Sequence, residues 1–383
     1  MFWKYFLFEA KLLLHNRKNW LLGIALVLYF PIFIYYTNQA PNESLRDVKR
    51  AEQEQLQLIL EMYGSELYEG TPEQQEVYQN LIKQASLVNF QVFYIRGGEV
   101  ADNYIDNGLE LTEYRLQLRN LKTQGIADHL ILSEEETLKE DTLLQYLKDE
   151  QIDLDSNLFF SENQFVLAFG GLSGIIFILY LLISANDIVV YELRHESVLK
   201  GMPISFMKKM NVKIILRALQ TILFLILGVL SGVLMIVKMF GGKVLNNPIL
   251  IYLNGQYEVV PLHHYIFLAT AMMVFIMFII YYLSILLNLL FKNAYTNIVI
   301  GVSLFLIPDF MTLLLNSASF MAPLMFINFT DVLSGEMAQQ LGNSNIDFIY
   351  ASSWLIVLGL LFIGLLYTRN KLSFRQVEIN LEK

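Results

Sequence analysis

Residues 214–237 read IILRALQTILFLILGVLSGVLMIV, and this stretch decides the fold. Arg217 is its only charged side chain. At about 1.5 Å per residue, a helix of this length spans the roughly 30 Å hydrocarbon core of a bilayer. A helix also pairs its backbone groups internally, as lipid requires, and the stretch lacks the alternating polar pattern of a barrel strand. We therefore predict a transmembrane helix here.

Five further apolar runs extend this prediction along the chain. Of the 383 residues, 55% are apolar and 16% are charged, which is more apolar surface than a soluble domain of this size buries. The sequence therefore predicts an all-α membrane protein with six transmembrane helices. A cleaved signal peptide is the less favoured interpretation of the first run, because a 19-residue segment precedes it. The other five spans are expected at 20–36, 165–186, 264–290, 297–315 and 350–368.

The distribution of Lys and Arg predicts the orientation. The N-terminal tail, the segment 187–213, the connection after the fourth span and the tail 369–383 together hold 14 of these residues. The two short connections on the opposite side hold only Lys238 and Lys243. Because basic residues remain on the cytoplasmic side, both termini are expected in the cytoplasm.

The long segment 37–164 is then expected outside the cell. From position 43 to position 162 it contains 25 Asp and Glu against 10 Lys and Arg. The acidity fits either the solvated surface of a helical domain or the binding of cationic peptides. We predict a small, acidic, helix-rich extracellular domain.

Local signals indicate where helices of this domain begin. Thr71 precedes a proline, and Ser133 with Glu136 has the spacing of a capping box. The run 90–95 is rich in β-prone residues, so a short strand is an alternative at that point.

A basic elbow is predicted between the second and third spans. Residues 186–213 read NDIVVYELRHESVLKGMPISFMKKMNVK. A short helix ending near Gly201 and Pro203 would lie at the membrane surface, and Ser205 would cap a second, basic helix. Such an elbow can carry movement from a cytoplasmic subunit into two spans. An ordinary basic loop is the alternative interpretation.

The chain carries no recognisable catalytic or nucleotide-binding motif. Its one Gly-Lys pair, at Gly242, is followed by valine and does not form a phosphate-binding loop. There are no cysteines, and the HExxH-like start at His195 lacks its final histidine. We expect no catalytic, cofactor or metal residues in this chain, so that any ATP chemistry comes from another subunit.

The elbow resembles the first cytoplasmic loop of ABC-2 type exporter permeases. That loop typically combines acidic residues, a short apolar stretch and a Leu-Pro-Ile-Ser-like turn. The Gly-Thr that usually follows the acidic residues is missing here. The resemblance assigns coupling to a partner ATPase to Glu192, Glu196, Leu199, Gly201, Pro203, Ile204 and Ser205.

The resemblance extends to the topology. Permeases of this family have six spans, cytoplasmic termini and an amphipathic N-terminal helix on the inner surface, which residues 1–19 fit with Trp3 at the interface. The connection 316–349 resembles their partly re-entrant outer segment. The resemblance implies a multi-pass exporter of the bacterial plasma membrane, which contacts lipid but not nucleic acid. It would form a homodimer, or a heterodimer with a related permease.

The same resemblance implies an external motor and a class of cargo. A separate cytoplasmic ABC ATPase would bind ATP and Mg, and the cargo would be a peptide, a drug or a similar molecule. Two other function classes remain open. A membrane enzyme would need paired carboxylates or a Ser/His site within the spans, and none is evident. A membrane sensor or immunity protein would bind a ligand through the outer domain without transport.

Polar and small residues within the spans suggest specific roles. Asp309 either belongs to a substrate pathway or, if Pro308 ends the helix, caps the next turn at the outer surface. Arg217 is expected to extend toward the inner interface. Two small-xxx-small patterns are expected to allow close helix packing, within the subunit or between subunits. They are formed by Gly170 and Gly174, and by Gly228 and Gly232.

Overall fold

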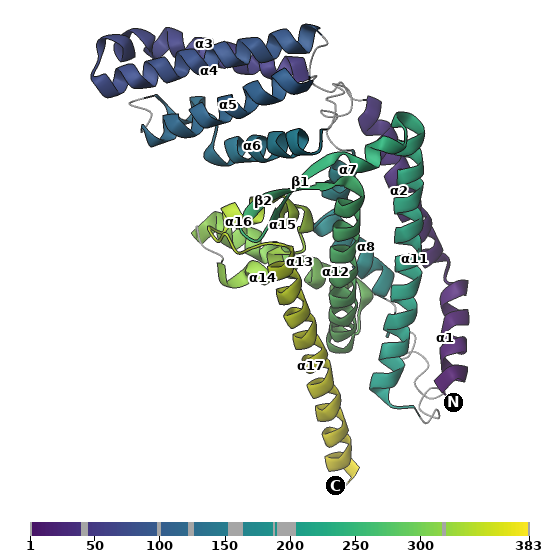
Figure 1. The fold of residues 1–383 in the computed structure, drawn as a ribbon. Helices are drawn as coiled ribbons and strands as arrows, with labels where there is room; N and C mark the ends of the chain where they lie inside the picture. Colours follow the sequence, from purple (N-terminus) through teal and green to yellow (C-terminus); the bar gives the residue numbers. More distant parts are fainter. Residues whose placement is uncertain are drawn as a thin grey trace.

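The computed structural model describes residues 2–39, 45–97, 101–121, 126–151, 164–186, 188–189, 204–315 and 319–381. Within these residues the chain forms two parts (Figure 1). One part is a bundle of long apolar helices with a short β-hairpin at one end. The other is a smaller helical unit that packs against this hairpin.

Five helices of the described chain are long and apolar enough to cross a membrane. Two shorter helices, bent by 54° at the break between them, together meet the same criterion. The chain is therefore a mainly helical, multi-pass membrane protein by the length and composition of its helices. The five are α2 (Arg17–Gln39), α11 (Phe206–Phe240), α12 (Leu262–Phe291), α13 (Ala294–Leu315) and α17 (Phe348–Leu381), and the bent pair is α7 (Gln164–Leu172) with α8 (Ile175–Ala185).

The bent pair divides the span that the sequence predicts at 165–186. Gly174 has φ +67° and ψ −129°, a conformation that interrupts a right-handed helix and that residues with a side chain rarely adopt. Its backbone N–H donates to the Ile327 carbonyl over 3.2 Å. A segment distant in the sequence thus provides the hydrogen-bond acceptor for the N–H at the start of α8. Because the run 165–186 is hydrophobic throughout, its sequence does not reveal the break.

Helices α2 and α11 lie side by side and run in the same direction. Successive residues of one meet successive residues of the other, and Gly23 faces Phe224 at one level of the contact. Further along, Gly228 and Gly232 of α11 approach Leu26 and Phe30 of α2. This close packing makes the two helices a single rigid element of the bundle.

Within its described residues, the smaller unit contains four α-helices and one short 3₁₀ helix. Residues 90–95 lie within one of these helices and form no strand, because burial of Val88 and Val92 follows helical spacing. The predicted helix starts at Pro72 and after Ser133 are confirmed, the latter with a complete capping box to Glu136. The elements are α3 (Leu45–Glu69), α4 (Pro72–Gly97), α5 (Ala101–Asn120), η2 (Asp128–Leu130) and α6 (Glu134–Asp149).

A β-hairpin interrupts the otherwise helical chain between α11 and α12. The sequence analysis predicts no strand here. Strands β1 (Pro248–Leu253) and β2 (Gln256–Pro261) pair antiparallel around Asn254 and Gly255, which both have positive φ, as tight hairpin turns require. In Figure 1 the hairpin lies between the helical unit and the bundle.

Short helices follow α13 and pack beneath the hairpin, in the segment predicted as re-entrant. Gly335, with φ +83°, lies against the ring of Tyr252 in β1. Asp347 accepts the N–H of Asn254 in the hairpin turn and the N–H of Tyr350 in α17, at 3.0 and 2.8 Å. The hairpin is thereby attached to the start of α17. The short helices are η4 (Ser319–Met321), α14 (Ala322–Met325), α15 (Phe329–Ser334) and α16 (Glu336–Gln340).

Candidate functional site

The N-terminal helix α1 (Phe2–His15) is joined to the beginning of α11 by a buried ion pair. The Nζ of Lys213 lies 3.1 and 3.2 Å from the two carboxylate oxygens of Glu9. Tyr5, Val212 and Leu216 form a small apolar cluster around this contact. Removal of either charge would leave the other buried without its partner, so the pair holds α1 firmly against α11.

The predicted coupling residues fall partly at this junction. Ile204 packs against the apolar cluster between α1 and α11. Ser205 occupies the N-cap position of α11 with extended backbone, but its side chain makes no cap hydrogen bond. The predicted cap position is therefore correct and the predicted cap bond is absent. Glu192, Glu196, Leu199, Gly201 and Pro203 lie outside the described residues.

Lys18 connects the first span to the end of the bent pair. Its Nζ donates to the Ile183 carbonyl over 2.9 Å and to Asn186 Oδ1 over 2.6 Å. A lysine at the last turn of a helix satisfies carbonyls that have no intrahelical partner. From the sequence, Lys18 counts only among the basic residues of the N-terminal tail, because its acceptors are more than 160 positions away.

The four predicted packing glycines have different surroundings. A Cβ at Gly228 would lie 2.9 Å from the Leu26 carbonyl, and one at Gly232 would lie 3.0 Å from Phe165, so both positions require a small residue. A Cβ at Gly170 would meet no atom within 4 Å. Gly174 is needed for the bend, and a Cβ there would clash with the side-chain oxygen of Asn328.

Asp309 lies in a helix that continues through the preceding proline. Because α13 runs on to Leu315, the alternative that Pro308 ends the helix and leaves Asp309 as a cap is wrong. The Asp309 side chain is exposed, and its charge acts on Asp331 in α15. Burial, followed by the charges of Glu336 and Asp309, raises the pKa of Asp331 above its ordinary value.

Arg217 is buried in the described part of the chain, whereas its sequence position predicts a side chain that extends toward the inner interface. Its side chain is 7% exposed and lies within the bundle, where its charge acts on Tyr180 and Tyr281. Helix α12, which carries Tyr281, packs against α11 and against α8, which carries Tyr180. The burial of Arg217 depends on helices that are distant in the sequence, so the residues around position 217 do not indicate it.

Four charged side chains form a buried network in the helical unit. Lys49 lies 2.9 Å from Glu52 and 2.7 Å from Glu140, while Arg115 pairs with both glutamates. Burial of the Glu140 carboxyl opposes its ionisation, but the charges of Lys49 and Arg115 prevail and lower its pKa to about 2. The four side chains are ionised, and the network that they form joins α3, α5 and α6.

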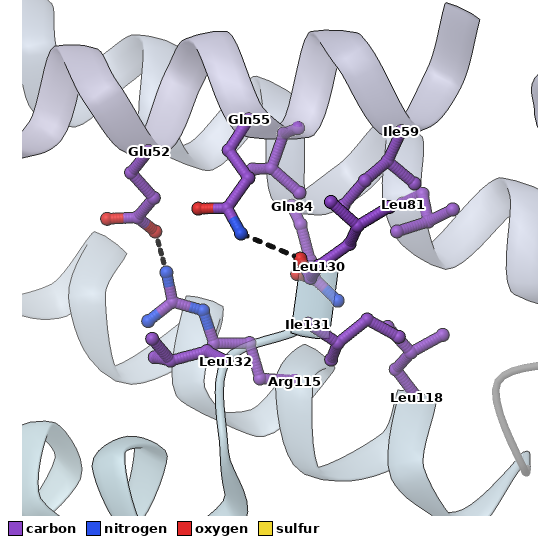
Figure 2. Close-up of a pocket in the computed structure, with 11 residues that line it drawn as sticks. Glu52, Gln55, Ile59, Leu81, Gln84, Arg115, Leu118, Leu130, Ile131 and Leu132 are labelled. Carbon is purple, nitrogen blue, oxygen red and sulfur yellow. Dashed lines mark hydrogen bonds and ion pairs between the residues drawn. The ribbon is translucent and has the colours of Figure 1, made fainter. Parts of the chain in front are cut away.

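A small cavity adjoins this network. The cavity has a volume of about 40 Å³. At its wall, Arg115 points toward Glu52 and Gln55 donates to the Leu130 carbonyl (Figure 2). The Gln55 hydrogen bond is 2.9 Å long. Leu81 and Ile59 close its apolar side. A volume of this size admits water but no organic ligand, so the cavity supports a structural role.

Tyr257 of the hairpin contacts helix α6 of the helical unit. The Tyr257 hydroxyl hydrogen-bonds Glu135 in α6, and Lys139 lies 5.1 Å from the centre of the Tyr257 ring. Burial, followed by the hydrogen bond to Glu135, raises the pKa of Tyr257. Hydrogen bond and cation–π contact together fix α6 on the hairpin.

No protein-family model, curated protein or solved structure matches this chain. The residues described above group into two candidate regions. One is the junction of α1, α2, α8 and α11, with Ile204, Ser205 and Lys18. The other is the hairpin region, where α15 with Asp331 packs against β1, and the charge of Asp309 acts on Asp331.

Proposed function

We propose that this chain is the membrane subunit of an exporter driven by a separate cytoplasmic ATPase. The observation that carries the proposal is the buried Glu9–Lys213 pair, which joins α1 to α11 directly beside the end of the 187–213 segment. In this proposal the segment is the docking site of the ATPase and both termini are cytoplasmic. The α1 helix lies on the inner membrane surface. The bent pair is the second span along the chain and brings the number of spans to six. The helical unit is extracellular.

The contacts around the junction support transmission of movement. A displacement of Ser205 moves α11, which is packed tightly along α2 at Gly228. Lys18 then links α2 to the end of α8, and Lys213 links α11 to α1. Docking at one segment therefore acts on four helices together. ATP and Mg bind to the partner ATPase, and two permease chains form the complex.

The proposal is tested by isolating the ATPase subunit that it requires. The tagged chain, purified from its native membranes after mild crosslinking, should bring down a nucleotide-binding subunit that hydrolyses ATP. Replacement of Glu192 or Pro203 by alanine should then uncouple hydrolysis from transport without loss of the complex. Recovery of no ATPase, or unchanged transport by both variants, would contradict the proposal.

A ligand sensor or immunity protein is the second candidate. The observation in its favour is the attachment of the helical unit to the hairpin through Tyr257 and Glu135, and of the hairpin to α17 through Asp347. Such a connection would transmit ligand binding without transport. A ligand that changes exchange protection of α17 in a chain purified without an ATPase would favour this candidate.

A further inference from the structure

Polar side chains from three helices gather in the bundle near the N-terminal half of α11. The hydroxyls of Thr221 and Tyr281 lie 2.6 Å apart, and both side chains are buried. From α8, the side chain of Tyr180 lies near Thr221, and that of Ser184 lies near Tyr281. Arg217 lies one turn before Thr221, and its charge acts on both tyrosines. A polar cluster therefore exists inside an otherwise apolar bundle.

Two amide side chains at the contact between α2 and α11 add to this cluster. Asn19 is 3% exposed, and neither its amide nitrogen nor its oxygen has a hydrogen-bond partner in the described chain. The Nε2 of Gln220 is also inaccessible and unpartnered. Because α2 and α11 run parallel with Gly23 facing Phe224, Asn19 and Gln220 lie at the same level, one turn before that contact. Unpartnered buried amides destabilise a fold, so their presence requires an explanation.

The chemistry of these groups favours an anionic ligand. The unpartnered atoms are two NH₂ groups and one carbonyl oxygen, so donors outnumber acceptors. Helices α2, α8, α11 and α12 carry no Asp or Glu, whereas α11 places the guanidinium of Arg217 on the turn next to Gln220. Arginine donates strong, charge-assisted hydrogen bonds to carboxylate and phosphate oxygens, and amide N–H groups add neutral ones.

We propose that Asn19, Gln220 and Arg217 form a binding site for a carboxylate or phosphate group within the bundle. Gln220 is only half-buried, which places it at the edge of the contact between α2 and α11. The group belongs either to the headgroup of an anionic lipid or to a solute. Binding is a property of this chain alone, so its test is independent of any ATPase.

The test uses the full chain in phosphatidylcholine nanodiscs, with tryptophan fluorescence as the reporter. Replacing Trp3 and Trp354 by phenylalanine leaves Trp20, which is adjacent to Asn19 in the chain and 5.5 Å from the ring of Phe224. One arm adds phosphatidylglycerol to the nanodiscs. The other adds N-acetylalanine or inorganic phosphate to the solution. We expect a saturable change in one arm, which identifies the source of the group.

Variants separate the site from general effects of charge. Gln220→Glu replaces the donor by a carboxylate and should weaken binding at least tenfold. Asn297→Asp is the matched control, because it makes the same change at a buried amide of α13 that already donates to Asn288 over 2.5 Å. The control should bind as the parent does. Absence of saturable binding in both arms, or equal affinity in Gln220→Glu, would overturn the proposal.

A second measurement tests Asn19 without relying on fluorescence. Asn19→Leu removes an unpartnered amide, so the melting temperature of the ligand-free protein should rise while the increase caused by ligand is lost. A lower melting temperature together with unchanged binding would show that Asn19 has a purely structural role, and would contradict the proposed site.

Discussion

Lys213 and Glu9 form an ion pair across the contact between α11 and α1, with both side chains less than one-tenth exposed. The two residues are separated by 204 positions in the chain. Their burial makes the pair sensitive to loss of one partner, since the remaining charge would stay in an apolar setting. This relationship ties the amphipathic N-terminal helix to the segment that precedes α11.

We expect Lys213→Met to destabilise the protein by about 3 kcal/mol, because it leaves the Glu9 carboxylate buried without its cation. The free energy of unfolding in detergent measures this effect. The double variant Glu9→Gln, Lys213→Met should lose less than the sum of the two single variants. Additive losses would mean that the two charges do not interact in solution.

Gly174→Ala should destabilise the bend by about 1–3 kcal/mol, because alanine rarely adopts φ +67° and its Cβ would meet Asn328. Gly170→Ala is the matched control. A Cβ added at Gly170 would meet no atom, and the residue is helical, so we expect this variant to gain up to about 1 kcal/mol of stability. Thermal unfolding of the two variants tests the contrast, and equal effects at both positions would refute the strained role of Gly174.

The helical unit should lose stability as the pH falls from about 4.5 to about 2. The pKa of Glu140 is lowered from 4.5 to about 2, so the contribution of its ionised form is complete above pH 4.5 and disappears as the pH approaches the folded value. Pepsin cleavage between positions 45 and 151, normalised to a denatured substrate, measures the opening of the unit.

Glu140→Gln should flatten this pH dependence and increase cleavage already at pH 4.5. Glu61→Gln is the control, because Glu61 is exposed on α3 and outside the network. If the control flattens the profile as much as Glu140→Gln does, the pH dependence does not arise from the buried network.

Tyr257→Phe should loosen the hairpin from α6, since it removes the hydrogen bond to Glu135 while the ring remains available to Lys139. We expect protection of the β1–β2 amides against hydrogen exchange to fall about tenfold, which corresponds to about 1.4 kcal/mol. Tyr68→Phe, at an exposed tyrosine of α3, should leave this protection unchanged. Unaltered protection in Tyr257→Phe would show that the hydroxyl does not hold the hairpin.

The sequence analysis correctly predicted the features that depend on residues within one element. Apolar runs of sufficient length predicted the long helices of the bundle, and the capping box from Ser133 to Glu136 predicted the start of α6. The hairpin was within reach as well, because Asn254-Gly255 between two runs of β-branched and aromatic residues is a turn signal. The hairpin was not predicted because its residues lie in a short connection between two expected membrane spans.

The sequence by itself therefore determined the membrane class, the helical content and most helix starts, because hydrophobic length and capping are local properties. Only the tertiary structure decided the bend at Gly174, the burial of Arg217 and the Glu9–Lys213 pair. Each depends on a partner far away in the chain. An apolar run specifies that a helix is buried but not which neighbour it meets, so the polar contacts inside the bundle follow from packing alone.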